Sequence, residues 1–165
     1  MPLYSQDQIK TIAAKIKDVR FAMFTTVDDE NVLSSRPMTV QQIDNEGNMW
    51  FFTSDEVAFT HYLEHHPDVS VSFSNPGDNL YLSVTGQAYL LHDRAKAREL
   101  WSPAVLAWFP VGLDDPHLAL IRVKIQSAEY WDASSSKMKQ LFHVARAAIS
   151  GRAQIDIGKH TTICL

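Results

Sequence analysis

Arg36 is the residue whose type and position most directly suggest chemistry. It belongs to Ser34-Ser35-Arg36-Pro37-Met38, a segment inside a run typical of a β-strand. An arginine in the middle of a strand must reach solvent or meet an anion, and proline is tolerated in a sheet only at an edge or bulge. Two interpretations stay open: a structural salt bridge, or contact with the phosphate or carbonyl of a ligand.

A second segment with polar groups follows at Phe52-Thr53-Ser54. Hydroxyl and backbone N–H groups stand there where a predicted strand gives way to a predicted helix, and a helix N-terminus favours anions. The same residues would also serve as an ordinary helix cap, which involves no ligand. They are therefore candidate ligand contacts, together with Arg36.

An aromatic segment in the second half of the chain indicates a covered surface. Trp101 and Trp108 stand among Pro and Gly residues that favour turns, and Trp131 follows within Glu129-Tyr130-Trp131-Asp132. These are three of the chain's four tryptophans. Because indole rings are usually buried with a partner for the N–H, three of them beside turns predict a surface that protein or a ligand covers.

Common catalytic motifs are missing: the phosphate loop, the dinucleotide fingerprint, paired cysteines, the nucleophile elbow and the metalloprotease helix. One spacing is typical of a metal site, because His61 and His65 stand at i and i+4 of a predicted helix with His66 beside them. No cysteine lies nearby, and the flanking Glu64 and Pro67 favour a solvated helix face. We predict no metal site.

The periodicity of apolar residues predicts the elements that position these side chains. A period of two indicates strands, and a period near 3.6 indicates helices. Strands are expected at residues 21–27, 32–43, 49–53, 69–74, 80–91 and 118–131, with a bend or bulge at Gly86. Helices are expected at residues 5–18, 55–65, 93–101 and 138–149.

Short hairpins without strand–helix alternation predict an antiparallel six-stranded β-barrel with peripheral helices, a mainly β fold. With 165 residues, of which 45% are hydrophobic, the chain is long enough for one well-packed domain. We expect a single domain over residues 1–165. An N-terminal helix at 1–18 and a C-terminal helix and tail at 136–165 would be additions to the barrel.

The net charge and the cysteine content limit the possible binding partners and the cellular compartment. The net charge is −4 and no run of Lys or Arg occurs, so we expect no nucleic acid partner. No stretch approaches the ~20 apolar residues that span a bilayer, and residues 1–7 lack the basic and apolar segments of a secretory leader. The single cysteine, Cys164, can form no internal disulfide. We therefore expect a cytoplasmic protein with no membrane contact.

Several segments carry a family resemblance by their order along the chain. They are Arg36-Pro37-Met38, Trp50-Phe51-Phe52-Thr53-Ser54, Val69-Ser70-Val71-Ser72-Phe73, Val84-Thr85-Gly86-Gln87-Ala88, Leu100-Trp101, Trp108-Phe109-Pro110-Val111-Gly112, Asp115-Pro116 and Glu129-Tyr130-Trp131-Asp132. This ordered set, over residues 5 to 135, resembles general stress protein 26-like members of the pyridoxamine 5′-phosphate oxidase-like family. The resemblance implies an FMN-binding split barrel and a homodimer whose interface holds two flavin mononucleotide sites.

The resemblance also implies cofactor contacts. The strand segment at Arg36 would pass the flavin ring and its ribityl phosphate chain, and the step at Thr53 would contact the cofactor through backbone and side chain. Trp108 and Trp131 would reach it from the partner subunit, and Tyr81 stands where the oxidases tend to offer an amide. The implied cofactor-binding residues are Ser35, Arg36, Pro37, Met38, Phe52, Thr53, Ser54, Tyr81, Trp108 and Trp131.

Residues 55–59 depart from the family pattern. Flavin-binding relatives usually have a serine and a basic residue there, whereas this chain has Asp55-Glu56-Val57-Ala58-Phe59. A phosphate with about −1.5 to −2 charges would face two acids, with Arg36 as the evident cation. Inward-pointing carboxylates would weaken binding by repulsion, while outward-pointing ones would leave the backbone amides available.

Two functions therefore stay open. The first is an FMN-binding, stress-related oxidoreductase of unknown substrate, with hydride transfer at the flavin ring and FAD as the alternative cofactor. The sequence identifies no catalytic residue for it. The second is a non-catalytic dimeric split-barrel binding protein that has lost or weakened flavin binding. Oxidation of vitamin B6 is disfavoured, because the basic substrate-phosphate residues of those oxidases have no evident counterpart in the C-terminal part.

Overall fold

Six antiparallel strands close into a barrel in the computed structural model, which describes residues 5–132 and 161–164. The order around the ring is β3-β2-β1-β4-β5-β6, and pairing of β3 with β6 closes it. The strands are β1 (Phe21–Val27), β2 (Leu33–Ile43), β3 (Asn48–Ser54), β4 (Asp68–Asn75), β5 (Leu80–Leu91) and β6 (Leu118–Trp131). The predicted six-stranded antiparallel barrel is confirmed.

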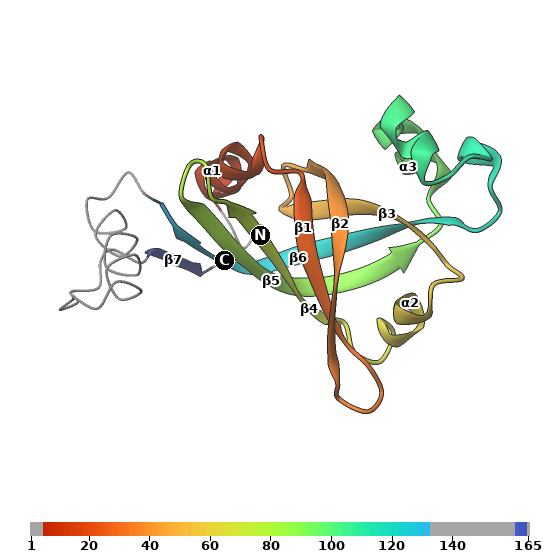
Figure 1. Cartoon of the computed structure of the whole chain (residues 1–165), viewed down its shortest axis with the longest axis horizontal. Helices are drawn as coiled ribbons and strands as arrows, with labels where there is room; N and C mark the ends of the chain where they lie inside the picture. Colours follow the sequence, from red (N-terminus) through yellow and green to blue (C-terminus); the bar gives the residue numbers. More distant parts are fainter. Residues whose placement is uncertain (1–4, 133–160, 165) are drawn as a thin grey trace, which may run out of the picture.

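A further strand, β7 (Thr161–Cys164), pairs with the last part of β6 outside the ring. The sequence predicted a helix and tail for this part of the chain, so the strand is a finding of the structure. The helix predicted at 138–149 lies outside the described residues. Figure 1 shows β7 at one end of the long β6 and helix α3 (Arg94–Leu100) at the other.

Alternating side chains fill the interior of the barrel. Along β1, Ala22, Phe24 and Thr26 are buried while the residues between them are more exposed. The Phe24 ring meets that of Phe51 edge to face, with 5.3 Å between the ring centroids. Aromatic pairs prefer this geometry, which adds to the free energy gained by burying both rings.

Gly86 marks the bulge that the sequence predicted in β5. The register between β5 and β6 shifts between Thr85 and Gly86. A Cβ atom at position 86 would lie 2.3 Å from the backbone oxygen of Lys124, so only glycine allows the two strands to approach this closely. Bulges bend strands and increase their twist, which helps a sheet to close.

Helix α1 (Gln6–Ile16) begins at the cap that the sequence predicted. Ser5 Oγ accepts a hydrogen bond from the Gln8 backbone N–H, and Gln8 Oε1 accepts one from the Ser5 N–H, which is a complete capping box. The helix buries Ile9, Ile12 and Ile16, and the last two join the barrel core.

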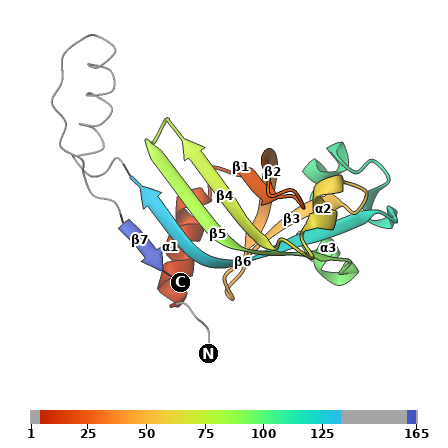
Figure 2. The same cartoon turned by 90° about the horizontal axis from the view of Figure 1, so that it is seen from below.

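Helix α2 spans only Ala58–Tyr62, so the helix predicted at 55–65 is wrong at both ends. Before it, Asp55 donates its backbone N–H to the His117 carbonyl, and Glu56 donates its N–H to Ser54 Oγ. These bonds hold the entry to α2 as a turn. In Figure 2, α2 and α3 lie at one end of the barrel and α1 and β7 at the other.

Helix α3 and two short 3₁₀ helices, η1 (Pro103–Ala107) and η2 (Gly112–Asp114), cover the outer face of β3 and β6. Phe52 of β3 packs there against the rings of Trp101 and Phe109, at centroid distances of 5.6 and 6.3 Å. Trp101 therefore covers the barrel of its own chain. Among the helices of the described ranges, none is long and apolar enough to cross a bilayer.

Candidate functional site

The two polar segments that the sequence indicated, at Arg36 and at Phe52-Thr53-Ser54, lie at the same end of the strand pair β2 and β3. Val40 of β2 pairs with Phe51 of β3 in antiparallel fashion. Because the strands run in opposite directions, moving back along β2 toward Arg36 and forward along β3 toward Ser54 leads to the same end. The barrel thus brings together the first two groups of predicted binding residues.

Arg36 lies on the inner face of β2 beside Phe24, its cross-strand partner. Its Nη1 donates to the buried hydroxyl of Thr26 at 2.9 Å, and its Nη2 donates to Ser34 Oγ at 2.6 Å and to the Ser34 carbonyl at 3.0 Å. The guanidinium also stacks over the Phe59 ring, 4.2 Å from its centroid. The side chain is thereby held in one position against α2.

The charge of Arg36 has no carboxylate partner within residues 5–132, so the salt bridge that the sequence also allowed is not found there. The group is partly buried, and this burial lowers the pKa of the Arg36 guanidinium from its ordinary value, although arginine stays charged in proteins. A partly desolvated cation that contacts only neutral groups is suited to meet an anion from outside the chain.

Neighbours of Arg36 divide between the two faces of β2. Ser35 and Pro37 are exposed, and Ser35 Oγ shares a 2.7 Å hydrogen bond with Thr25 Oγ1. Met38 points back toward the barrel and packs against the core. Of this predicted segment, Arg36 and Met38 therefore face inward, while Ser35 and Pro37 lie on the outer surface beside β1.

The side chains of Phe52-Thr53-Ser54 on β3 also point to different sides of the sheet. The Phe52 side chain points outward into the cluster beneath α3, so only its backbone remains for a ligand on the inner side. Thr53 is 6% exposed, and its hydroxyl is 3.5 Å from the Ser54 carbonyl. Ser54 Oγ accepts the Glu56 N–H within the turn before α2, whose N-cap is Val57 without a side-chain hydrogen bond, so the cap function that the sequence left open is not found at Ser54.

The other three predicted residues lie elsewhere. Tyr81 and Trp131 are cross-strand partners at the start of β5 and the end of β6. Leu120 of β6 pairs with Phe52, and Trp131 lies about 35 Å farther along the strand at roughly 3.3 Å per residue. Trp108, at the end of η1, is 75% exposed. One chain therefore does not gather all of the predicted residues around one point.

The Asp55 carboxylate meets two histidines that sequence reasoning missed. Its Oδ2 lies 2.8 Å from His92 Nε2, and its Oδ1 lies 2.9 Å from His117 Nδ1. His117 Nε2 lies 3.5 Å from Glu56 Oε1. These contacts settle the direction of the Asp55 side chain, which points to imidazoles rather than freely to water. No sequence spacing signals the cluster, because its members come from separate connections.

These contacts shift the ionisation of both partners. The hydrogen bond from His92, followed by that from His117, lowers the pKa of Asp55. The hydrogen bond to Asp55 raises the pKa of His117, with additional attraction from Glu56 and Asp115. Asp55 therefore stays a carboxylate at neutral pH, and the protonated form of His117 is favoured.

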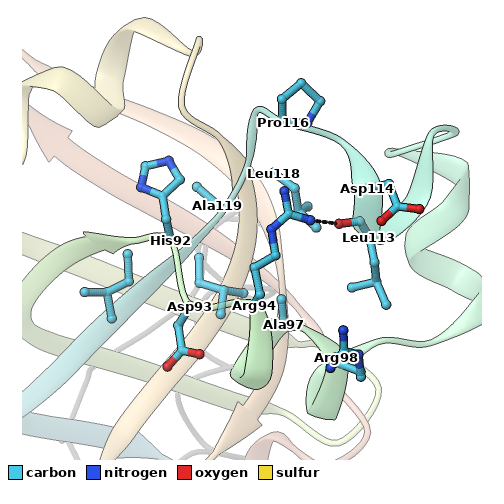
Figure 3. Close-up of a pocket in the computed structure, with 12 residues that line it drawn as sticks. His92, Asp93, Arg94, Ala97, Arg98, Leu113, Asp114, Pro116, Leu118 and Ala119 are labelled. Atoms are coloured by element: carbon cyan, nitrogen blue, oxygen red, sulfur yellow. Dashed lines mark hydrogen bonds between the residues drawn. The ribbon is translucent and has the colours of Figure 1, made fainter.

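A small pocket lies between α3, η2 and the start of β6 (Figure 3). Its lining includes Ala97, Leu118 and Leu120, and Arg94 bridges it by donating to the Leu113 carbonyl, as Figure 3 shows. Its volume of about 130 Å³ is below the ~300–1,000 Å³ typical of small-molecule sites. His92 lines it, but none of the cofactor-binding residues predicted from the sequence does.

The other histidines form no comparable cluster in the described part of the chain. His66 Nε2 lies 3.4 Å from Asp29 Oδ1, and His61 and His65 are exposed at the end of α2 and just beyond it. Within residues 5–132, no group of three His, Cys, Asp or Glu side chains is arranged to hold a metal ion.

Comparisons with known proteins agree with this fold. The sequence model of the family described as pyridoxamine 5′-phosphate oxidase like matches residues 7–156. Protein bli-3 of Neurospora crassa is 28% identical over 155 residues, which cover 88% of this chain and 74% of that protein.

Two solved structures are similar to this chain in sequence and fold. The general stress FMN/FAD binding protein of Xanthomonas citri is 29% identical, with a TM-score of 0.66 over 94% of this chain and 99% of that one. A protein assigned to a general stress family from Xanthomonas campestris is 35% identical, with a TM-score of 0.60 over 76% and 87% of the two chains. The chain therefore belongs to the pyridoxamine 5′-phosphate oxidase-like family.

Proposed function

We propose that this protein binds FMN at the end of the barrel beside Arg36 and acts as a homodimeric, stress-related oxidoreductase in the cytoplasm. The observation that carries the proposal is the Arg36 guanidinium, which is held in place by neutral groups and lacks a carboxylate partner in residues 5–132. Support comes from family membership and from the FMN/FAD binding protein of X. citri, which is similar over nearly the whole chain.

The proposed site combines residues of two chains. Ser35, Arg36, Pro37, Met38, Phe52, Thr53 and Ser54 would come from one chain, with Ser35, Pro37 and Phe52, whose side chains point outward, acting through their backbones. Tyr81, Trp108 and Trp131 would come from the second copy, because Tyr81 and Trp131 lie at the start of β5 and the end of β6, and the Trp108 side chain is 75% exposed. A bound flavin supplies hydride or electron transfer, while these residues orient the ring and keep water away.

An apolar outer face on β1 and β2 supports the homodimer. Phe21 and Met23 are 68% and 45% exposed, and Leu33 is 70% exposed. Met23 is paired with the exposed Pro37, so apolar side chains from both strands share one surface. Single exposed apolar residues are ordinary, but a shared patch of them is typical of a protein interface.

The flavin test begins with the purified protein. We expect visible flavin absorption that persists through gel filtration, or quenching of FMN fluorescence on titration with the colourless apoprotein. Arg36→Ala is expected to weaken FMN binding by roughly 1.5–3 kcal/mol, because a charged hydrogen bond is lost. Arg20→Ala, at an exposed arginine before β1, is the matched control and should leave the affinity unchanged. A protein that neither carries nor quenches flavin contradicts the proposal.

One observation favours the second function, a dimeric barrel with lost or weakened flavin binding. Phe59, in the segment where flavin-binding relatives usually have a serine and a basic residue, is 9% exposed and packs against Phe24 at 6.1 Å between ring centroids. It is part of the core and offers no charge to a phosphate. The same titration distinguishes the two functions, because only the first predicts saturable quenching that depends on Arg36.

A further inference from the structure

Three chain segments meet at the Asp55 carboxylate. Asp55 follows β3, His92 follows β5, and His117 precedes β6. The two imidazoles approach different carboxylate oxygens, at 2.8 and 2.9 Å, so each oxygen has a partner. A backbone hydrogen bond of 3.0 Å from the Asp55 N–H to the His117 carbonyl fixes two of the segments to each other.

The cluster and Arg36 border the same short helix. Arg36 stacks on Phe59 of α2, while the hydroxyl of the next residue, Thr60, donates to the Val57 carbonyl at 2.7 Å and lies 3.5 Å from the Asp55 carbonyl. Asp55 also follows directly on Ser54 at the end of β3 that the proposed site uses. Arg36 and the cluster are therefore both tied to the segment from Ser54 to Thr60.

The charges around the two histidines come from all three segments. Asp55 and Glu56 stand before α2, Asp115 stands before His117, and Asp93 and Arg94 follow His92. The Asp93 carboxylate caps α3 by accepting the Lys96 N–H, and Arg94 is directed to the Leu113 carbonyl. When both imidazoles are neutral, the negative charges of Asp55 and Glu56 repel an incoming phosphate. When both imidazoles are protonated, their positive charges neutralise those of the two acids.

We propose that His92 and His117, oriented by Asp55, replace the missing basic residue at the phosphate end of the flavin site, so that recognition of the phosphate becomes stronger as the pH falls. This inference rests on the proposed function. It makes the two histidines determinants of specificity for FMN over riboflavin, which has the same ring and ribityl chain without the phosphate. The raised pKa of His117 agrees with this role.

The test compares FMN and riboflavin by fluorescence titration near pH 6 and pH 8. The quantity measured is the Kd of riboflavin divided by the Kd of FMN. We expect this ratio to be roughly threefold to tenfold higher near pH 6, the size expected of one or two partly exposed charge pairs. The phosphate itself loses negative charge near its second pKa of about 6, so ligand titration alone would change the ratio in the opposite direction.

Variants assign the effect to the histidines. His92→Gln with His117→Gln keeps polar side chains that cannot be protonated, so only the phosphate still titrates, and we expect a ratio that is no higher near pH 6 than near pH 8. His61→Gln, at an exposed histidine of α2, is the matched control and should retain the full change. Should the double variant not fold, Glu56→Gln at a side chain that is 68% exposed gives a second test. It is expected to tighten FMN binding at both pH values without changing riboflavin binding.

Three outcomes would overturn the inference while leaving flavin binding intact. They are a ratio that does not change with pH, a double variant that folds and keeps the pH dependence of the natural protein, and a Glu56→Gln protein that binds FMN no more tightly. If neither flavin binds at either pH, the proposed function itself is overturned, and the inference with it. Binding of riboflavin thus separates the two kinds of failure.

Discussion

At the scale of single residues, Asp55 shows how distant contacts decide the role of an acid. From its neighbours in sequence, it is either a first-turn helix residue facing water or a repulsive charge in a phosphate site. The structure gives it two imidazole partners instead. His92 and His117 lie far from Asp55 and from each other in the sequence, so spacing within one sequence could not predict the cluster.

The ion pair between Asp55 and His117 predicts a stability effect with a defined pH window. The raised pKa of His117 stabilises the fold below about pH 6.5, and this contribution is lost as the pH rises through the folded-state pKa. The lowered pKa of Asp55 stabilises the fold above about pH 3.9, and this contribution is lost as the pH falls through its folded-state pKa. Both contributions are present together between these limits.

Asp55→Asn should therefore lower the free energy of unfolding more near pH 5.5 than near pH 8.5. Urea unfolding at the two pH values measures the difference. The control is Glu30→Gln, which removes an exposed carboxylate in the turn between β1 and β2 and should have the same small effect at both. Equal costs of Asp55→Asn at the two pH values would show that the contact acts as a neutral hydrogen bond.

At the scale of elements, strands were predictable because apolar and polar residues alternate in the sequence in the same way as inward and outward side chains alternate in the barrel. The pattern along β1 and β4 places alternate residues inside the barrel, and the bulge at Gly86 is where the sequence indicated it. Helix α2 was overpredicted at its start, because Val57 has an extended backbone (φ −75°, ψ 125°) and the chain before it is held to the His117 carbonyl by the Asp55 N–H. That hydrogen bond is a tertiary contact, and local sequence carries no signal of it.

The close approach at Gly86 predicts a large cost for any side chain there. Gly86→Ala would place a Cβ atom 2.3 Å from the Lys124 backbone oxygen, so β5 and β6 must separate. We expect the free energy of unfolding to fall by ~1–3 kcal/mol or more, as in overpacked cores. Chemical denaturation measures this. Gly77→Ala is the matched control, because its nearest atom would be a side-chain oxygen at 3.5 Å and the loss should stay small.

The capping box of α1 predicts a smaller cost. Ser5→Ala removes the oxygen that accepts the Gln8 N–H, which leaves a donor of the first turn without its partner. We expect a loss of about 1 kcal/mol in the free energy of unfolding, measured by thermal or urea denaturation. Ser5→Asp keeps an acceptor at the cap and should restore most of the stability. A similar loss in both variants would mean that the cap contributes little.

At the scale of the whole molecule, the barrel explains why the site was only partly predictable. Closure of β3 onto β6 brings Thr53 beside Ala119 and directs Phe52 to the outside, under Trp101. Trp101 is thereby covered within its own chain. The resemblance implied Trp108 and Trp131 as contacts from a partner subunit, and the place of Trp131 at the end of β6 and the exposure of Trp108 are consistent with that proposal.

The proposed homodimer predicts that charge on the outer face of β1 and β2 separates the subunits. Phe21→Lys with Leu33→Lys replaces two side chains that are 68% and 70% exposed, so the isolated fold should lose little stability. A dimer would instead have to bury two uncompensated ammonium groups in each copy, which costs several kcal/mol per charge after relaxation. We expect a dimeric mass for the natural protein and a monomeric mass for the variant in light scattering at micromolar concentration.

The affinity for FMN should also fall in the monomeric variant, because Trp108 and Trp131 of the second copy would no longer reach the flavin ring. The control is Ala14→Lys, which adds a positive charge on the exposed side of α1 and should leave both the mass and the FMN affinity unchanged. A natural protein that is monomeric contradicts the proposed dimer. A variant that becomes monomeric and still binds FMN with full affinity would place the whole site within one chain. The contacts of Arg36, Met38 and Thr53 would then have to hold the ring without help from the tryptophans.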